Sequence, residues 1–203
     1  MTKSIYDQLN AYGTVAKQRM VETFTGDALD TDRWDSTLVG SGSVGMTDAV
    51  DGGLFLKTGA STNDSTELTF DGKKPFSDTA SVMIFTANRI SSAGSRYDIG
   101  MTNSNDAVYI RNNANASKYT MHTSAGSSTE TTTFSNNVDT ATWHTLKIEC
   151  KSSSIDGYLD GVLEGTSTTN LPNAGRLEPW LKCTHNNSVV AETRIKYVEC
   201  YNT

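Results

Sequence analysis

Residues 143–150 read Trp143-His144-Thr145-Leu146-Lys147-Ile148-Glu149-Cys150, and residues 155–161 read Ile155-Asp156-Gly157-Tyr158-Leu159-Asp160-Gly161. In the first run, Leu146, Ile148 and Cys150 alternate with polar residues, and this alternation is typical of a strand with one buried and one wet face. A short polar segment joins the two runs, and Asp-Gly pairs tolerate the positive φ of tight turns. The stretch therefore predicts an antiparallel hairpin.

The same pattern extends over most of the chain. From residue 22 onward, short alternating runs are separated by Gly, Asn, Asp and Ser, which is typical of an all-β sandwich of two antiparallel sheets. The run 81–86 is apolar with little alternation, so we expect a central strand covered on both faces. No Pro-rich linker divides the 203 residues, and we predict one β-sandwich domain over 22–203.

The N-terminal segment carries a different pattern. Apolar residues recur there at steps of three and four, which predicts a short helix within residues 1–21; they are Ile5, Leu9, Tyr12, Ala16 and Met20. Gly13 lies inside this stripe and makes the helix marginal on its own. We therefore expect it to lie on its own sheet or to act as an assembly arm on another subunit of a homo-oligomer.

Composition excludes several classes of partner. Lys and Arg number 17 against 23 Asp and Glu, a formal charge of -6, so the chain has no broad basic field for nucleic acid or anionic lipid. No apolar run approaches the roughly 18 to 20 residues of a membrane helix. The N-terminus also lacks the pattern of a secretory signal, and we expect synthesis in a cytoplasm without cleavage.

The hairpin over 143–161 resembles one found in the concanavalin A-like lectin and glucanase jelly rolls, including laminin G-like modules. In these domains a strand opening with W-H-x-L leads into one ending Y-x-D-G. The segment from Phe24 to Trp34 is similar to the start of such domains, and Arg194 to Glu199 is similar to their last strand. The resemblance implies a two-sheet jelly roll, a fold that hosts lectins and enzymes alike.

A second resemblance concerns the whole arrangement. A jelly roll without a signal sequence, a short N-terminal arm and the closing segment from Lys196 to Thr203 is similar to virion-associated proteins of tailed phages. This implies a non-enzymatic structural protein on the virion surface, made in the host cytoplasm. Its partners would be capsid or tail subunits, with the domain repeated in a symmetric assembly.

Enzymatic alternatives lack their motifs. A retaining glucanase needs two carboxyl groups about 5 to 5.5 Å apart, and on this fold they usually come from an E-x-D-x-x-E strand, which is absent. A polysaccharide lyase would need clustered Arg, His and Tyr. Neighbouring expected strands do carry such residues, without a lyase motif: Arg96, Tyr97, Tyr109, Arg111, Tyr119 and His122. We predict no enzyme, with a diverged hydrolase or lyase as the remaining alternative.

A glycan-binding lectin is the second hypothesis. Tyr109 alternates with Ala107 and Arg111 and should lie on a polar sheet face, where an aromatic ring can pack against a sugar. Arg111, Asn112 and Arg96 would supply hydrogen bonds, and the ligand would be a host-surface glycan. Tyr97 and Tyr119 alternate with apolar residues and should instead join the core.

Three acidic residues, Asp27, Asp30 and Asp32, could attract Ca²⁺ together with Asp35. They lack the spacing of a dedicated calcium loop, so Asp caps of a tight turn are the main interpretation. No other cofactor is expected.

The three cysteines, at positions 150, 183 and 200, cannot all pair within one chain, and we expect buried thiols. Metal binding by Cys183 and His185, with a third ligand from Cys150 or His144, is the alternative.

Overall fold

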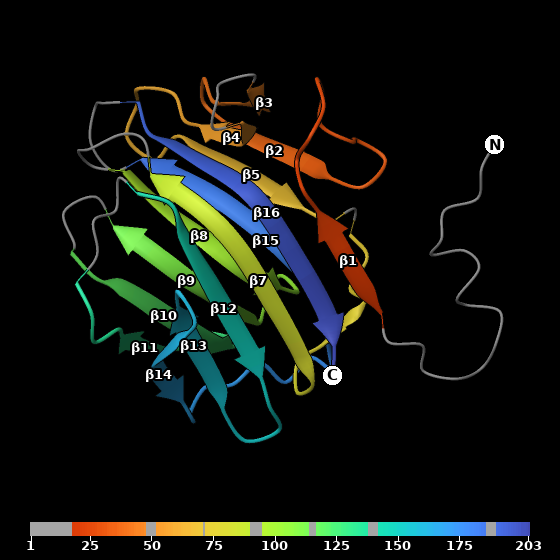
Figure 1. Ribbon diagram of the computed structural model, residues 1–203, viewed down its shortest axis with the longest axis vertical. Coiled ribbons are helices and arrows are strands. Elements are labelled where there is room, and N and C mark those ends of the chain that lie inside the picture. Colours follow the sequence, from red (N-terminus) through yellow and green to blue (C-terminus); the bar gives the residue numbers. More distant parts are fainter. Residues whose placement is uncertain are drawn as a thin grey trace, which may run out of the picture.

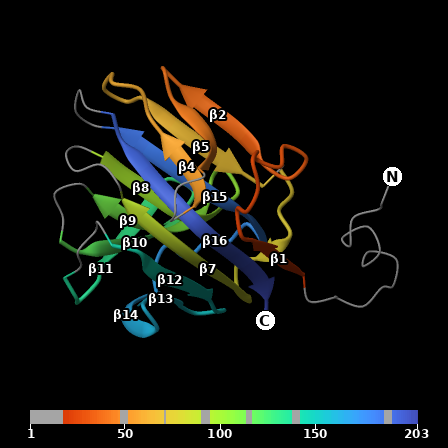
Figure 2. The ribbon, with the colours of Figure 1, turned by 45° about the horizontal axis from the view of Figure 1, so that its top comes forward.

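The computed structural model describes residues 18–47, 52–70, 72–89, 95–113, 117–137, 142–185 and 190–203. In these ranges every regular element is a β-strand, and the strands form two antiparallel sheets. The sheets stack face to face with their strands running in similar directions (Figure 1), and the tilted view in Figure 2 shows the same two layers. None of the described segments forms a helix that could span a membrane.

Sheet A contains the deciding hairpin. Its strands in spatial order are β14 (Val162–Ser167), β13 (Ile155–Leu159), β12 (His144–Cys150), β7 (Ser81–Arg89), β16 (Glu192–Asn202), β4 (Gly53–Lys57) and β3 (Ser43–Thr47), with β1 (Arg19–Glu22) also paired to β16. Leu146 pairs with Leu159 and Cys150 with Ile155, which confirms the hairpin. β7 lies between β12 and β16, and both Val82 and Met83 on its opposite faces are buried.

Sheet B forms the second layer. Its strands in spatial order are β11 (Ser128–Thr133), β10 (Tyr119–Ala125), β9 (Ala107–Asn113), β8 (Ser95–Thr102), β15 (Arg176–His185), β5 (Ser65–Thr69) and β2 (Asp35–Val39), with β6 (Phe76–Ser77) also paired to β15. The inward faces of the two sheets bury one hydrophobic core. The predicted two-sheet antiparallel jelly-roll sandwich is confirmed.

The predicted N-terminal helix is wrong where the structure describes it. Met20 lies in the strand β1, which pairs with β16 from Arg19 opposite Tyr201 to Glu22 opposite Val198, and Met20 is completely buried. A marginal helix gains little by itself, whereas the end of β16 offers unpaired backbone groups that a strand satisfies. The other residues of the proposed arm, Ile5, Leu9, Tyr12 and Ala16, lie outside the described residues.

The cysteines are buried and free, as expected. Burial raises the pKa of Cys150 and of Cys183 to about 12, so both thiols stay protonated. No group of three or more His, Cys, Asp or Glu side chains could hold a metal ion in the described part of the chain, which contains Cys183, His185 and Asp27, Asp30 and Asp32.

Candidate functional site

The outward-facing side chains of β10, β9, β8, β15 and β5 form a surface that we call the outer face of sheet B. On β8, Tyr97, Ile99 and Met101 are buried in the core, so alternation turns Arg96, Asp98 and Gly100 to the outer face. The register of the strand pairing then aligns these outward-facing residues in two rows that run across the sheet. One row is His122, Tyr109, Gly100 and Trp180, and the other is Thr120, Arg111, Asp98, Lys182 and Glu67.

The first row is an aromatic ridge made of His122, Tyr109 and Trp180. The Tyr109 ring stacks on the His122 imidazole with centroids 4.9 Å apart and planes inclined by 6°. Tyr109 also meets Trp180 edge to face at 5.3 Å. Tyr109 and Trp180 lie on either side of Gly100, so their rings come together over a residue without a side chain.

The second row is built around the buried carboxylate of Asp98, which is 1% exposed. It accepts hydrogen bonds from Arg111 Nε at 2.7 Å and Nη2 at 3.0 Å, a bidentate ion pair. Arg96 Nε lies 3.5 Å from the same carboxylate. Arg111 Nη2 also donates to the Tyr109 hydroxyl at 3.2 Å, so the ion pair fixes the ridge.

A second carboxylate orients the other end of the ridge. Glu67 accepts a hydrogen bond from Trp180 Nε1 at 2.8 Å and one from Lys182 Nζ at 2.9 Å. Burial raises the pKa of the Tyr109 hydroxyl, so this group stays a protonated donor at neutral pH. The face therefore presents ring edges beside oriented hydroxyl, carboxylate, guanidinium and ammonium groups.

His122 is buried and neutral. Its Nε2 is 3.0 Å from Thr120 Oγ1 and its Nδ1 is 3.1 Å from Thr131 Oγ1. Burial lowers the pKa of His122 to about 4, helped by the positive charges of Arg111 and Arg96 and opposed by Asp98. The imidazole is therefore uncharged at neutral pH.

This pKa predicts an acid-dependent loss of stability. His122 has an ordinary pKa of 6.5 when unfolded and about 4 when folded, so protonation favours the unfolded chain. Its contribution is complete above pH 6.5 and falls as the pH drops toward 4. Between neutral pH and about pH 4.5, wild type should lose about 2 kcal/mol more unfolding free energy than His122→Phe, measured by urea denaturation. Equal losses in both proteins would contradict this assignment.

The Arg, His and Tyr group considered for a lyase assembles in part: Arg96, Arg111, His122 and Tyr109 lie on this face, whereas Tyr97 and Tyr119 are buried in the core. Both imidazole nitrogens are engaged by threonine hydroxyls, and the pKa of Tyr109 is raised, so neither group is prepared to remove a proton. The outward positions 96, 98 and 100 of β8 hold one carboxylate, Asp98. The arrangement is thus best suited to holding a hydroxyl-rich ligand.

Three of the four predicted glycan-binding residues, Arg96, Tyr109 and Arg111, lie together on this face. Asn112 does not. It is completely buried on the core side of β9, and neither its amide nitrogen nor its amide oxygen has a hydrogen-bond partner among the residues that the structure describes. The alternation that turns Tyr109 and Arg111 outward necessarily turns Asn112 inward.

Sequence reasoning missed Asp98, Trp180, Glu67 and Lys182. Alternation within β8 could have placed Asp98 beside Arg96, because Tyr97 and Ile99 are clearly core residues. Trp180, Lys182 and Glu67 could not be placed, since they reach this face only through the pairing of β15 with β8 and β5, which are far apart in sequence.

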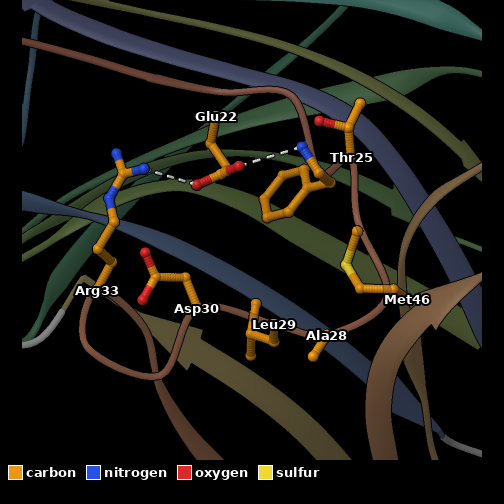
Figure 3. A pocket seen from close by; sticks show the side chains of 8 residues that line it. Glu22, Thr25, Ala28, Leu29, Asp30, Arg33 and Met46 are labelled. Atoms are coloured by element: carbon orange, nitrogen blue, oxygen red, sulfur yellow. Dashed lines mark hydrogen bonds and ion pairs between the residues drawn. The ribbon is translucent and has the colours of Figure 1, made fainter.

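A separate cavity of about 190 Å³ lies beside β1, lined by Glu22, Phe24, Thr25, Ala28, Leu29, Asp30, Arg33 and Met46 (Figure 3). Its polar groups bind one another: Glu22 accepts hydrogen bonds from Arg33 Nη1 at 2.9 Å and from the Phe24 backbone N–H at 3.2 Å. Asp30 accepts the Asp32 backbone N–H, so it caps its own turn as the main interpretation expected.

No family model matches the chain, and no curated protein matches its sequence. Solved structures, however, are similar to it in fold. LamA from Zobellia galactanivorans, bound to laminaritriose and laminaritetraose, superposes with a TM-score of 0.70 at 13% identity, covering 90% of this chain and 98% of LamA. The catalytic domain of a Thermotoga petrophila endo-1,3-beta-glucanase gives 0.69 at 11% identity, covering 92% and 98%. A Bacillus licheniformis beta-glucanase gives 0.65 at 14%, covering 91% and 98%.

This likeness shows that the chain has the glucanase-type, concanavalin A-like jelly-roll fold. It corrects two predictions, the non-enzymatic virion structural protein and the absence of enzymatic activity, because the similar structures are glucanases and a transglycosylase. Nothing in the comparisons supports a link to phage virions. The expected capsid or tail partners, homo-oligomer and virion location stay untested predictions, as does the expectation of no cofactor, with Ca²⁺ as its alternative.

Proposed function

We propose that this chain is a carbohydrate-active protein that binds a polysaccharide on the outer face of sheet B. The observation that carries the proposal is the aromatic ridge beside the ion-paired row of Arg111, Asp98, Lys182 and Glu67. Sugars present apolar C–H faces and many hydroxyl groups, and this face offers aromatic edges beside fixed donors and acceptors.

The extent of the face favours a chain over a single sugar. The second row crosses from Thr120 on β10 to Glu67 on β5, which are separated by four strand spacings. At about 4.8 Å per spacing this is roughly 19 Å, room for several sugar units. Because the similar solved structures include endo-1,3-beta-glucanases, a β-1,3-glucan is the first ligand to test.

Replacing Trp180 by alanine tests the proposal. Trp180 is half-buried in the ridge and held by Glu67, so its removal should weaken β-1,3-glucan binding about tenfold or more, measured by calorimetric titration. Trp143→Ala is the matched control, because Trp143 contacts Lys196 of sheet A and should leave affinity unchanged.

Binding that Trp180→Ala leaves intact would place the glycan site elsewhere. A chain that binds neither β-1,3-glucan nor mixed-linkage glucan at neutral pH would refute this choice of ligand. Release of reducing ends, measured on the same samples, shows whether binding is accompanied by cleavage of glycosidic bonds.

A further inference from the structure

His122 is the buried end of the aromatic ridge. It is 8% exposed, whereas Tyr109 and Trp180 are half-buried and reach the surface. A buried imidazole with both nitrogens already bonded has no free atom to offer a ligand. Its position against the flat side of the Tyr109 ring suggests a different task.

Two strands fix the imidazole. Thr120 lies two residues earlier on β10, and Thr131 is the cross-strand partner of His122 on β11. With one hydroxyl at each nitrogen, the ring can neither rotate nor flip without losing a hydrogen bond. The imidazole therefore gives the neighbouring Tyr109 ring a fixed flat surface to pack against.

The orientation of the Tyr109 ring depends on this packing against His122. Its ring is stacked on His122, its hydroxyl accepts from Arg111, and its third neighbour is Trp180. Gly100 offers no side chain between Tyr109 and Trp180, so the Tyr109 ring is held by His122, by Trp180 and by the Arg111 guanidinium, whose Cζ lies 5.3 Å from the ring centroid. Without His122, the Tyr109 ring would lose its flat contact and could tilt away from Trp180.

We propose that His122 is a positioning residue that holds the Tyr109 ring, and through it the whole aromatic ridge, in the orientation that binds polysaccharide, and that protonation of His122 releases the ridge. This inference rests on the proposed function of the face. The charged groups that act electrostatically on the imidazole are Arg111 on β9 and Arg96 and Asp98 on β8, and from β11 the Thr131 hydroxyl bonds its Nδ1. An imidazolium would add a third cation beside two arginines and one carboxylate, and one ring nitrogen could no longer accept a hydrogen bond.

The test compares full-length wild type, His122→Ala and His122→Phe in β-1,3-glucan titrations at neutral pH and at about pH 3.4, where a pKa of about 4 leaves roughly four-fifths of the His122 imidazoles protonated. Wild type should bind at least about fivefold more weakly in acid, and His122→Ala about tenfold more weakly already at neutral pH. His122→Phe keeps a flat ring that cannot be protonated, so its affinity should lie within about twofold of wild type at neutral pH and should be about fivefold higher than that of wild type in acid. Carboxylates that titrate in this range are shared by all variants, so their effect cancels when two variants are compared at the same pH.

His144→Ala is the control, because His144 lies on β12 in sheet A and should leave affinity unchanged at neutral pH. A ligand-free readout separates this inference from the proposed function. Acrylamide quenching of Trp180 fluorescence, taken as the difference from Trp180→Phe, should rise in His122→Ala and in acidified wild type. Unchanged quenching and affinity in His122→Ala, or acid weakening in His122→Phe equal to wild type, would overturn the inference. Changed quenching without glucan binding would overturn only the proposed function.

Discussion

Replacing Asp98 by alanine is expected to lower the free energy of unfolding by about 3–5 kcal/mol. Asp98 is almost completely buried and is the carboxylate partner of both Arg111 and Arg96, whose side chains are only 18% and 29% exposed. Its removal leaves two guanidinium groups close together with no compensating charge. In a chain of this size the melting temperature should fall by roughly 6–20 °C, measured by calorimetry.

Glu67→Ala is the matched control on the same face. Glu67 and Lys182 are each about a quarter exposed, so this ion pair is screened by water and its loss should cost about 1 kcal/mol or less. Arg111→Ala and the double variant complete a cycle, in which the double loss should be smaller than the two single losses together by more than about 1 kcal/mol. Equal costs for Asp98→Ala and Glu67→Ala would show that burial does not strengthen the Asp98 pair.

The fold could be predicted from sequence because local signals agree with one another. Alternation and an Asp-Gly turn in the 143–161 stretch agree with the apolar run at 81–86 in indicating a layered β-sandwich, and β12 does pair with both β13 and β7. Residues 19–22 show where such reasoning fails. The periodicity there fits a helix, but a free length of β16 outcompetes a marginal helix for these residues.

The site was predictable only in part, for a physical reason. Arg96, Tyr109 and Arg111 lie on consecutive strands joined by short connections, so the alternation of side chains between the two sheet faces is enough to bring them together. Trp180 and Glu67 join the face through long-range pairings that no local pattern specifies. The prediction for Asn112 is wrong because a residue adjacent to Arg111 on the same strand points to the opposite face of the sheet.

Gly100→Ala is the second substitution with a large expected effect. A Cβ built at Gly100 would lie 2.0 Å from the Val108 carbonyl oxygen and 2.4 Å from the Tyr109 Cα, both in the backbone of β9. Cross-strand Cβ atoms are ordinarily about 4.5–5.5 Å apart, but this Cβ would be 2.7 Å from that of Tyr109. Neither strand can move aside without breaking ladder bonds at the centre of the outer face. We expect a loss of about 3 kcal/mol or more in unfolding free energy.

Gly45→Ala provides the control for Gly100→Ala. Gly45 lies on the edge strand β3, and its nearest atoms belong to the Phe55 side chain at 3.0 Å, which can turn away. Its substitution should cost about 1 kcal/mol or less. Because β8 must separate from β9 to admit a methyl group, Gly100→Ala should also displace Tyr109 from Trp180 and weaken β-1,3-glucan binding in whatever fraction remains folded. A stable Gly100→Ala protein with unchanged glucan affinity would show that the ridge does not require this close approach of the two strands.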